Sequence, residues 1–335
     1  MHLVSEIQDF EGKKVVVRTD WNVPHDRHKI LDTSRIDVTL ETIRYISSRG
    51  GIVVVISHFG REGESMMDLA NLLAEILPVE FIADPFSEEG RARLTNLKVG
   101  GVALVENLRK WQGEEENTEQ FAKDLASLGE IYVNEAFSAS HRSHASIVSV
   151  PKILPSFAGF HFMKEVTNLS RAFNPEHPFL FILGGAKLET KIPLVKEFLS
   201  VADNIFIGGA LAKPAKATEL GDNPKIIFPL GELDALDAGE ETLEMLRGKI
   251  NSARFILWNG PLGKYEDGYD KGTKTLALMI ALSNAEKIVG GGDTEEVIDV
   301  LNIKDKFSWV SLAGGAMLDF LAKRTLPGIE ALNRT

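Results

Sequence analysis

Residues 184–191, GGAKLETK, follow directly on the apolar run Phe179–Leu183 (FLFIL) near the middle of the chain. A buried strand that ends in glycines and then enters a helix brings bare backbone N–H groups and two lysines to one point. Glycine lets a ligand approach the backbone closely, and a helix N-terminus favours negative charge. The pattern is typical of a site for a ligand with several anionic oxygens, although a plain turn with solvated lysines fits this stretch equally well. The Walker A spacing, G-x-x-x-x-G-K-[ST], is absent.

Length and composition indicate a soluble protein of two domains. With 335 residues, the chain is longer than a single hydrophobic core usually supports. A net charge of −11 argues against a nucleic-acid partner, so an anionic ligand would need a local cationic pocket. The lack of cysteine excludes disulfides, thiol catalysis and zinc–thiolate sites. The chain has no signal-peptide pattern and no apolar run of membrane-spanning length, so we expect a cytoplasmic protein without a membrane partner.

Four apolar segments of the first half are expected to be strands, and each ends in polar or basic residues. The strands are expected at Lys14–Arg18 and at residues 51–56, 101–105 and 130–133. The residues that follow them are Asp20, Asn22, His58, Arg61, Arg109 and Arg142. Taken singly, an Asx turn or a structural histidine would explain them. Because parallel strands end at one edge of a sheet, we expect them to converge on a small anionic ligand.

Other charged residues of this half have local interpretations. Arg35 lies in the first turn of a helix expected at residues 33–48, where a cation opposes the helix dipole, so we expect it to have a partner. The acidic run at residues 114–116 is interpreted as solvated charge at a helix entry. His141 and His144 are interpreted as loop and core residues, because no carboxylate stands with them in a known metal-ligand spacing.

In the second half, the pattern of an apolar strand followed by glycines, first seen at residues 179–185, occurs again. Pro151 and Pro155 interrupt regular structure, and residues 160–173 are expected to form one helix that connects the domains. Strand, glycines and helix then recur four times, which is typical of nucleotide binding by backbone and helix ends. Asp293, in GGGDT, is a candidate Mg²⁺ ligand or a helix N-cap. A Rossmann dehydrogenase is not indicated, since G-x-G-x-x-G does not follow the first strand.

The ordered motifs resemble those of the phosphoglycerate kinase family along essentially the whole chain. They are DWNVP, SHFGR, ENLR with GEEEN, YVNEAFSASHRSHAS, GGAKLETKI, WNGPLGKYE, GGGDT and AGGA…LPG. The resemblance implies two Rossmann-like α/β domains with parallel sheets: an N-terminal phosphoglycerate-binding domain at 1–160, a connecting helix at 161–175, a nucleotide-binding domain at 176–318 and a segment at 319–335 that returns to the N-terminal domain. It also implies a monomer with hinge closure that transfers a phosphoryl group reversibly between 1,3-bisphosphoglycerate and ADP, giving 3-phosphoglycerate and ATP, in glycolysis and gluconeogenesis.

The resemblance also implies roles for individual residues. The residues that would bind phosphoglycerate are Asp20, Asn22, Arg35, His58, Arg61, Arg109 and Arg142. The residues that would bind ATP or ADP are Gly185, Lys187, Lys191, Gly208, Asn259, Pro261, Glu266, Gly292, Asp293 and Thr294. Among them, Asp293 would be the ligand of Mg²⁺. The residues that would act on the transferring phosphoryl group are Arg35, Lys187, Gly314 and Gly315.

The chain departs from the family pattern at three places. The segment between residues 208 and 258 is compressed, so we expect part of the adenine-side wall to be missing or rebuilt. Glu135 stands where an aspartate is usual, and Leu312 and Ala313 replace threonine and glycine at the last phosphate loop. The alternative to an active kinase is therefore a catalytically impaired paralogue that binds nucleotide or phosphoglycerate. The presence of both lysines and of Asp293 favours an active enzyme.

Overall fold

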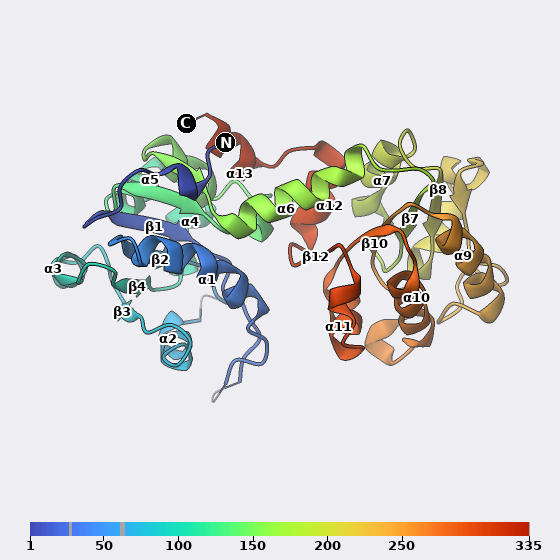
Figure 1. Cartoon of the computed structure of the whole chain (residues 1–335), viewed down its shortest axis with the longest axis horizontal. Helices are drawn as coiled ribbons and strands as arrows, with labels where there is room; N and C mark the ends of the chain where they lie inside the picture. The colour runs from blue at the N-terminus through green and yellow to red at the C-terminus, as the bar shows by residue number, and fades with distance from the viewer. Residues whose placement is uncertain (27–28, 61–63, 335) are drawn as a thin grey trace. The chain divides into compact units, whose positions relative to one another are not determined.

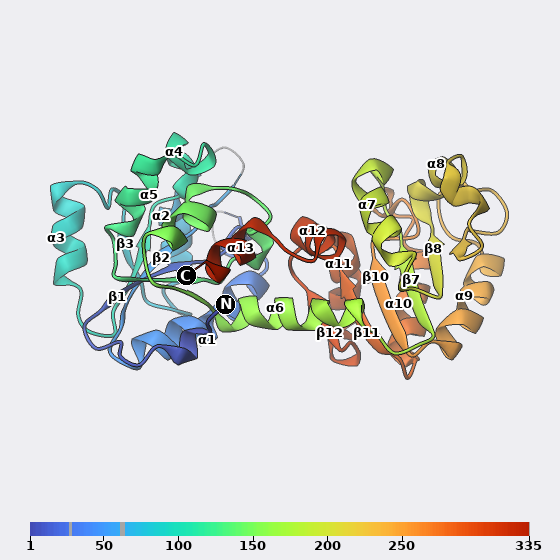
Figure 2. The same cartoon turned by 90° about the horizontal axis from the view of Figure 1, so that it is seen from above.

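A computed structural model of the chain describes residues 1–26, 29–60 and 64–334. The chain forms two compact units: unit 1 is Met1–Val166 with Thr325–Thr335, and unit 2 is Thr167–Arg324. Each unit holds one six-stranded parallel sheet covered by helices (Figures 1 and 2). This confirms the predicted class of two parallel-sheet α/β domains. The finer division, with a separate connecting helix, stays a prediction.

Unit 1 is built on a sheet with the strand order β3-β4-β2-β1-β5-β6. Its strands are β1 (Lys14–Arg18), β2 (Ile52–Ile56), β3 (Glu80–Ile82), β4 (Val102–Val105), β5 (Ile131–Asn134) and β6 (Ser156–Ala158). Its helices are α1 (Ser34–Ser47), α2 (Met66–Leu72), α3 (Glu88–Asn96), α4 (Gln112–Glu115), α5 (Glu119–Ala126) and α13 (Pro327–Asn333). Helices α1 and α2 lie on one side of the sheet, and α4, α5 and α13 lie on the other (Figure 1). Since both faces are covered, the central strands are buried almost throughout, which their β-branched runs predict.

Three boundaries differ from the sequence expectation. Strand β6 begins directly after Pro155 and pairs with β5, so the prolines do not interrupt all regular structure. The apolar spacing of residues 68–77 predicts a helix there, but α2 begins at Met66 and ends at Leu72, because the side chain of Ser65 caps its start by accepting a hydrogen bond from the backbone of Met67. The helix expected at 160–173 is α6 (Phe160–Ser170), which is followed by a 3₁₀ turn.

Unit 2 is built on a sheet with the order β12-β11-β10-β7-β8-β9. Its strands are β7 (Phe179–Leu183), β8 (Asn204–Ile207), β9 (Ile226–Ile227), β10 (Phe255–Asn259), β11 (Glu286–Gly290) and β12 (Trp309–Ser311). Its helices are α7 (Leu188–Phe198), α8 (Ala212–Lys216), α9 (Glu240–Ser252), α10 (Lys271–Leu282), α11 (Gly292–Val300) and α12 (Gly315–Lys323). Helices α7 and α12 pack together on one face, and α9, α10 and α11 cover the other (Figure 1).

Both sheets have a point at which the chain reverses its direction of travel across the sheet. In unit 1, β1 is flanked by β2 and by β5, so the first crossovers and the later ones run to opposite sides. In unit 2, β7 is flanked in the same way by β8 and β10. Ligands of open α/β sheets bind outside the carboxyl ends of strands at such a point. The topology therefore places one candidate site after β1 and β5 and another after β7 and β10.

Glu135, which replaces the usual aspartate after β5, caps the first turn of α6. Its fully buried carboxylate accepts hydrogen bonds from the backbone N–H groups of His161 and Phe162, at 3.3 and 2.9 Å, and from the hydroxyl of Thr42. Burial raises the pKa of Glu135 to about 7, although these hydrogen bonds favour the charged form.

This pKa predicts a stability that falls as the pH rises. Between the ordinary glutamate value of 4.5 and about 7, the folded chain binds more protons at Glu135 than the unfolded chain does. The free energy of unfolding should therefore decrease through this window, by about 3 kcal/mol at most. Glu135→Gln should remove this part of the pH dependence. Urea unfolding of the full chain at pH 5 and pH 8 measures it, and an identical pH dependence in both proteins would contradict the prediction.

Candidate active site

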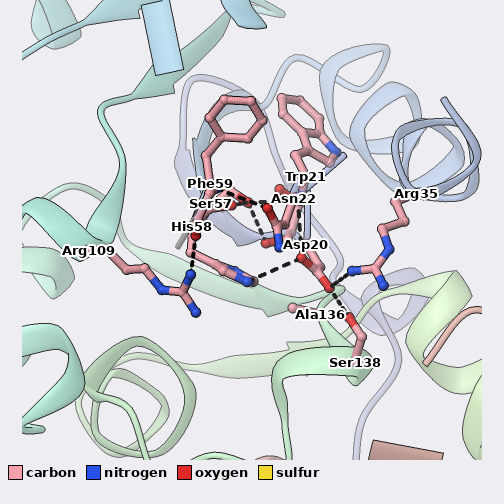
Figure 3. A network of polar contacts seen from close by, with 12 residues as sticks. Asp20, Trp21, Asn22, Arg35, Ser57, His58, Phe59, Arg109, Ala136 and Ser138 are labelled. Atoms are coloured by element: carbon pink, nitrogen blue, oxygen red, sulfur yellow. Dashed lines mark hydrogen bonds and ion pairs between the residues drawn. The ribbon is translucent and has the colours of Figure 1, made fainter. Parts of the chain in front are cut away.

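Asp20 is the centre of the polar network at the carboxyl end of β1 (Figure 3). Its Oδ2 accepts a hydrogen bond from Nη1 of Arg35 at 2.5 Å and another from the hydroxyl of Ser138, and its Oδ1 lies 3.6 Å from Nε2 of His58. Burial alone would raise the pKa of Asp20, but Arg35, the hydroxyl of Ser138 and Arg18 hold it below its usual value. The expected partner of Arg35 is thus Asp20, which explains a cation in the first turn of α1.

His58 is a neutral imidazole surrounded by cations. Its side chain is buried, and burial lowers its pKa to about 3. The neighbouring charges of Arg18, Arg109 and Arg142 act in the same direction as burial, whereas the charge of Asp20 opposes it. The four strands β4, β2, β1 and β5, which are adjacent in the sheet, bring these groups together. The convergence predicted from the strand ends is therefore present.

Asn22 and Arg109 hold the backbone of Gly60 from two sides. The Asn22 side-chain oxygen accepts from the N–H of Gly60 at 3.0 Å, and Arg109 donates to the carbonyl of the same residue. Arg109 Nε lies 3.3 Å from Glu115 Oε1 but makes no hydrogen bond within the described chain. Arg142 is half-buried, and its guanidinium has no hydrogen-bond or ion-pair partner among the described residues. Arg61 lies outside the residues that the structure describes.

The interpretation of residues 114–116 as solvated charge is wrong for Glu114. Its side chain is 1% exposed and binds both the backbone N–H and the hydroxyl of Ser146, at 2.9 and 2.5 Å. No local pattern indicates this contact, because Ser146 is 32 residues away along the chain. Arg18, also buried at 1% exposure, was missed as well. Its position in a strand covered on both faces is the signal that could have identified it.

In unit 2 the glycine turn after β7 is packed against the turn after β10. A side chain at Gly184 would place its Cβ 2.1 Å from the carbonyl oxygen of Pro261, so only glycine fits. The N–H of Gly185 donates to that same oxygen at 2.7 Å. Lys187 follows at the N-cap of α7 with φ of 64° and ψ of 67°, a left-handed conformation that is uncommon for lysine. Its side chain is exposed and has no partner among the described residues.

Lys191 lies one turn further along α7 and points back to the glycine turn. Its Nζ donates to the carbonyl of Gly184 at 2.5 Å. Burial lowers the pKa of Lys191 to about 8, and the nearby carboxylate of Asp293 opposes this shift. The ammonium is therefore held inside the site rather than in solvent.

Asp293 lies in the first turn of α11, and the alternative role as N-cap is wrong. The N-cap is Gly291, with φ of 111°, because α11 begins at Gly292, whereas the sequence predicts a helix over residues 295–301. The Asp293 carboxylate is half-buried and has no hydrogen-bond partner in the described part of the chain. Thr294 is a supporting residue: its buried hydroxyl accepts from the N–H of Gly260 at 3.0 Å. Asn259 supports the same loops by donating to the carbonyl of Gly290 at 2.8 Å.

Two neighbouring pockets open at these glycine turns. The smaller, of about 240 Å³, is lined by Gly185, Lys191, Asn259, Pro261, Gly292, Asp293, Thr294, Gly314 and Gly315, among others. A Cβ at Gly292, Gly314 or Gly315 would meet no atom within 4 Å, so backbone faces open space there. Gly314 is the N-cap of α12 and Gly315 its first residue. The predicted helix N-terminus therefore exists at this pocket.

The larger pocket, of about 430 Å³, shows how the compressed segment closes the site. Its lining includes Glu266 together with residues 233–236, which belong to that segment. Lys213 of α8 holds this stretch through an ion pair of 2.5 Å with Asp234. Residues of the shortened segment thus form part of the wall of this pocket, and its role as an adenine-side wall stays a prediction. Gly208 is buried against the ring of Phe206 and does not line this pocket, whereas its neighbour Gly209 does.

A family model for phosphoglycerate kinase matches residues 4–223 and 215–324. The chain belongs to the phosphoglycerate kinase family. It is 36% identical to a phosphoglycerate kinase of Borreliella burgdorferi, over 98% of both chains, and 36% identical to one of Thermosipho africanus, over 97% of this chain and 96% of that one. The alignment to the first spans 388 positions, more than this chain has residues, as a shortened family member requires.

Solved phosphoglycerate kinases have the same architecture. The chain is similar to the structure from Pyrococcus horikoshii with a TM-score of 0.88 and 30% identity, and to that from Coxiella burnetii with a TM-score of 0.85 and 31% identity. Each comparison covers 99% of this chain and 98% of the other. The compression of residues 208–258 therefore leaves the fold of a phosphoglycerate kinase intact. Among the described helices, none is both long and apolar enough to cross a membrane.

Proposed function

We propose that this protein is an active phosphoglycerate kinase that transfers a phosphoryl group reversibly between 1,3-bisphosphoglycerate and ADP. The observation that carries the proposal is the presence, in a member of this family, of two candidate anion sites at the topological switch points of its two sheets. One is a cluster of arginines and the other a set of glycine turns with two lysines. Phosphoryl transfer needs mainly positioning and charge compensation from the protein, which these groups can supply.

The phosphoglycerate is proposed to bind at the polar network after β1 and β5. Arg142 supports this assignment because its half-buried guanidinium has no partner among the described residues. Arg35 is held by Asp20 with one nitrogen and keeps further N–H donors for an anion. His58 would add a neutral N–H donor, and Asn22 and Arg109 would hold the backbone at Gly60 in place. Arg61 is included by family motif alone.

The nucleotide is proposed to bind in the two pockets of unit 2. The base would occupy the larger pocket beside residues 233–236, with Glu266 near the ribose. Lys187 and Lys191, with the bare backbone of Gly185 and Gly292, would receive the phosphates. Gly314 and Gly315 would direct the N-terminus of α12 at the phosphoryl group that moves. Leu312 and Ala313 are buried behind this turn, so neither replacement obstructs it.

Asp293 fits a magnesium ion that is shared with the nucleotide. The described residues include no group of three or more carboxylates or histidines that could hold a metal. Mg²⁺ commonly takes one protein carboxylate together with substrate phosphates and water, and Asp293 is a carboxylate without a hydrogen-bond partner in the described chain, beside the lysine pocket. When bound, the ion would neutralise charge on the phosphate oxygens.

Asp293→Asn should therefore weaken the use of magnesium without affecting phosphoglycerate binding. We expect kcat/KM for Mg-ATP to fall about a hundredfold and the half-saturating Mg²⁺ concentration to rise. Calorimetry of phosphoglycerate binding should be unchanged. Asp305→Asn, which removes an exposed carboxylate of the same unit, is the matched control. Equal magnesium dependence in the two variants would contradict the assignment of Asp293.

A coupled assay with Mg-ATP and 3-phosphoglycerate tests the proposed function directly. Turnover at rates of about 1 s⁻¹ or more is expected for a working kinase. Binding of both substrates without turnover would instead identify the impaired paralogue. We further propose a cytoplasmic monomer that binds no nucleic acid, in line with the net charge of −11. Light scattering of the purified protein tests the monomer.

A further inference from the structure

Arg18, the last residue of β1, lies buried directly behind His58. Its Nη2 is 3.4 Å from Nδ1 of His58, its Nε donates to the hydroxyl of Ser146 at 2.9 Å, and its Nη1 donates to the carbonyl of Thr19. A guanidinium has only donors and cannot accept a hydrogen bond. The Nδ1 atom that faces it must therefore present a lone pair, and the ring proton must be on Nε2.

The guanidinium is fixed in this position by a second buried group. The hydroxyl of Ser146 accepts a hydrogen bond from Arg18 and donates one to Glu114 Oε1 at 2.5 Å, while the backbone N–H of Ser146 donates to Glu114 Oε2 at 2.9 Å. The carbonyl of Ser146 also accepts from the hydroxyl of Tyr132 at 2.7 Å. Glu114 thus holds Arg18 through a bridging serine, which leaves the buried cation no alternative orientation.

The remaining groups that face His58 decide where its proton points. Asp20, in the loop after β1, lies 3.6 Å from Nε2 and is the one anion among the described groups that act on the ring. Arg109, which follows β4, and Arg142, which follows β5, are cations, as is Arg18. The N–H of Nε2 therefore points to Asp20, which also binds Arg35 (Figure 3).

We infer that Arg18 is a positioning residue, which fixes His58 as the neutral tautomer with its proton on Nε2, directed at the phosphoglycerate site. The inference rests on the proposed function, because it assumes that the anionic substrate binds at this edge. His58 then donates a hydrogen bond to the substrate throughout the neutral pH range instead of acting as a cation that is lost as the pH rises. Arg18 itself need not touch the substrate.

Nitrogen NMR of the imidazoles in the wild-type protein tests the tautomer without any assay. The His58 signals can be assigned from their absence in His58→Gln. We expect a protonated Nε2 and a bare Nδ1 from about pH 5.5 to pH 8. A proton on Nδ1, or an imidazolium at pH 7, would overturn the inference whether or not the protein is an active kinase.

Arg18→Met tests the role of the guanidinium. We expect His58 to sample both tautomers and to take up a proton at higher pH than in the wild type. KM for 3-phosphoglycerate should rise about tenfold, the effect of one hydrogen bond to a charged ligand, and should become pH-dependent below pH 7, while kcat changes much less. Arg18→Lys, which keeps a donor without an acceptor, should recover part of the loss.

Arg93→Met is the matched control. Arg93 belongs to the same unit, is bound to Glu80 at 2.9 Å and lies on α3, away from the site. Unchanged His58 signals and an unchanged KM in Arg18→Met would refute the inference. If Arg18→Met does not fold, as circular dichroism will show, Arg18→Lys and the wild-type spectrum decide. An inactive wild-type protein with the expected tautomer would refute the proposed function alone.

Discussion

Lys187→Ala is expected to lower kcat by about a hundredfold to a thousandfold while changing KM for either substrate only slightly. Lys187 has an exposed ammonium with no partner among the described residues, at the N-cap of α7. A mobile cation at a helix N-terminus can follow the charge that develops on the transferring oxygens, whereas it gains little from the bound ground state. The loss should therefore appear in kcat.

A control on the same helix separates this effect from a general loss of positive charge. Lys196 belongs to α7 and forms an exposed ion pair of 2.9 Å with Glu219. Exposed pairs of this kind contribute little to stability, so Lys196→Ala should leave both kcat and the unfolding curve nearly unchanged. Steady-state kinetics in both directions, with nucleotide binding measured by calorimetry, completes the test. A near-normal kcat in Lys187→Ala would end the assignment of this residue to phosphoryl transfer.

Arg35→Ala is expected to lower kcat/KM by about a hundredfold or more, with most of the loss in kcat. Arg35 is fixed by its 2.5 Å hydrogen bond to Asp20, so its free donors are aimed before the substrate arrives. Its removal also leaves the buried carboxylate of Asp20 with less compensation, which should raise the pKa of Asp20 from its lowered value. Activity should then fall further as the medium becomes more acidic.

A double-mutant cycle with Asp20→Asn distinguishes loss of the donor from loss of the pair. If Arg35 acts only by neutralising Asp20, the double variant should recover most of the activity of the wild type. If Arg35 acts on the substrate, the double variant should remain as impaired as Arg35→Ala. Arg44→Ala, which removes an exposed arginine from the last turn of the same helix, is the control and should have no effect.

The sequence alone predicted the class of fold and most of the candidate site, for reasons that are local. Apolar runs such as those of β1 and β7 form strands wherever they are buried, and glycines after a strand mark close backbone approach. The polar residues after β1, β2, β4 and β5 were therefore identified as a group. The boundaries that were wrong, at α2 and α11, depend on capping by Ser65 and Gly291.

Long-range contacts decided what the sequence could not. The acidic run around Glu114 suggests a solvated carboxylate. The side chain is nevertheless buried, and it binds Ser146, which belongs to a segment distant in the sequence. Glu135 has no local reason to titrate near neutral pH, but α6 and Thr42 enclose it. Residues 233–236 likewise line a pocket of unit 2, where Asp234 meets Lys213 of α8. In each case the partner comes from a distant segment, which no local pattern encodes.

The motifs by themselves predicted two kinds of anion-binding chemistry, arginines at strand ends and glycine turns with lysines. Only the tertiary structure decided that β4, β2, β1 and β5 are neighbours, that Asp20 holds Arg35, and that Arg18 stands behind His58. The physical reason is that residue type fixes what a side chain can donate or accept. Which partner a side chain meets, and how deeply it is buried, depends on which strands are neighbours in the sheet.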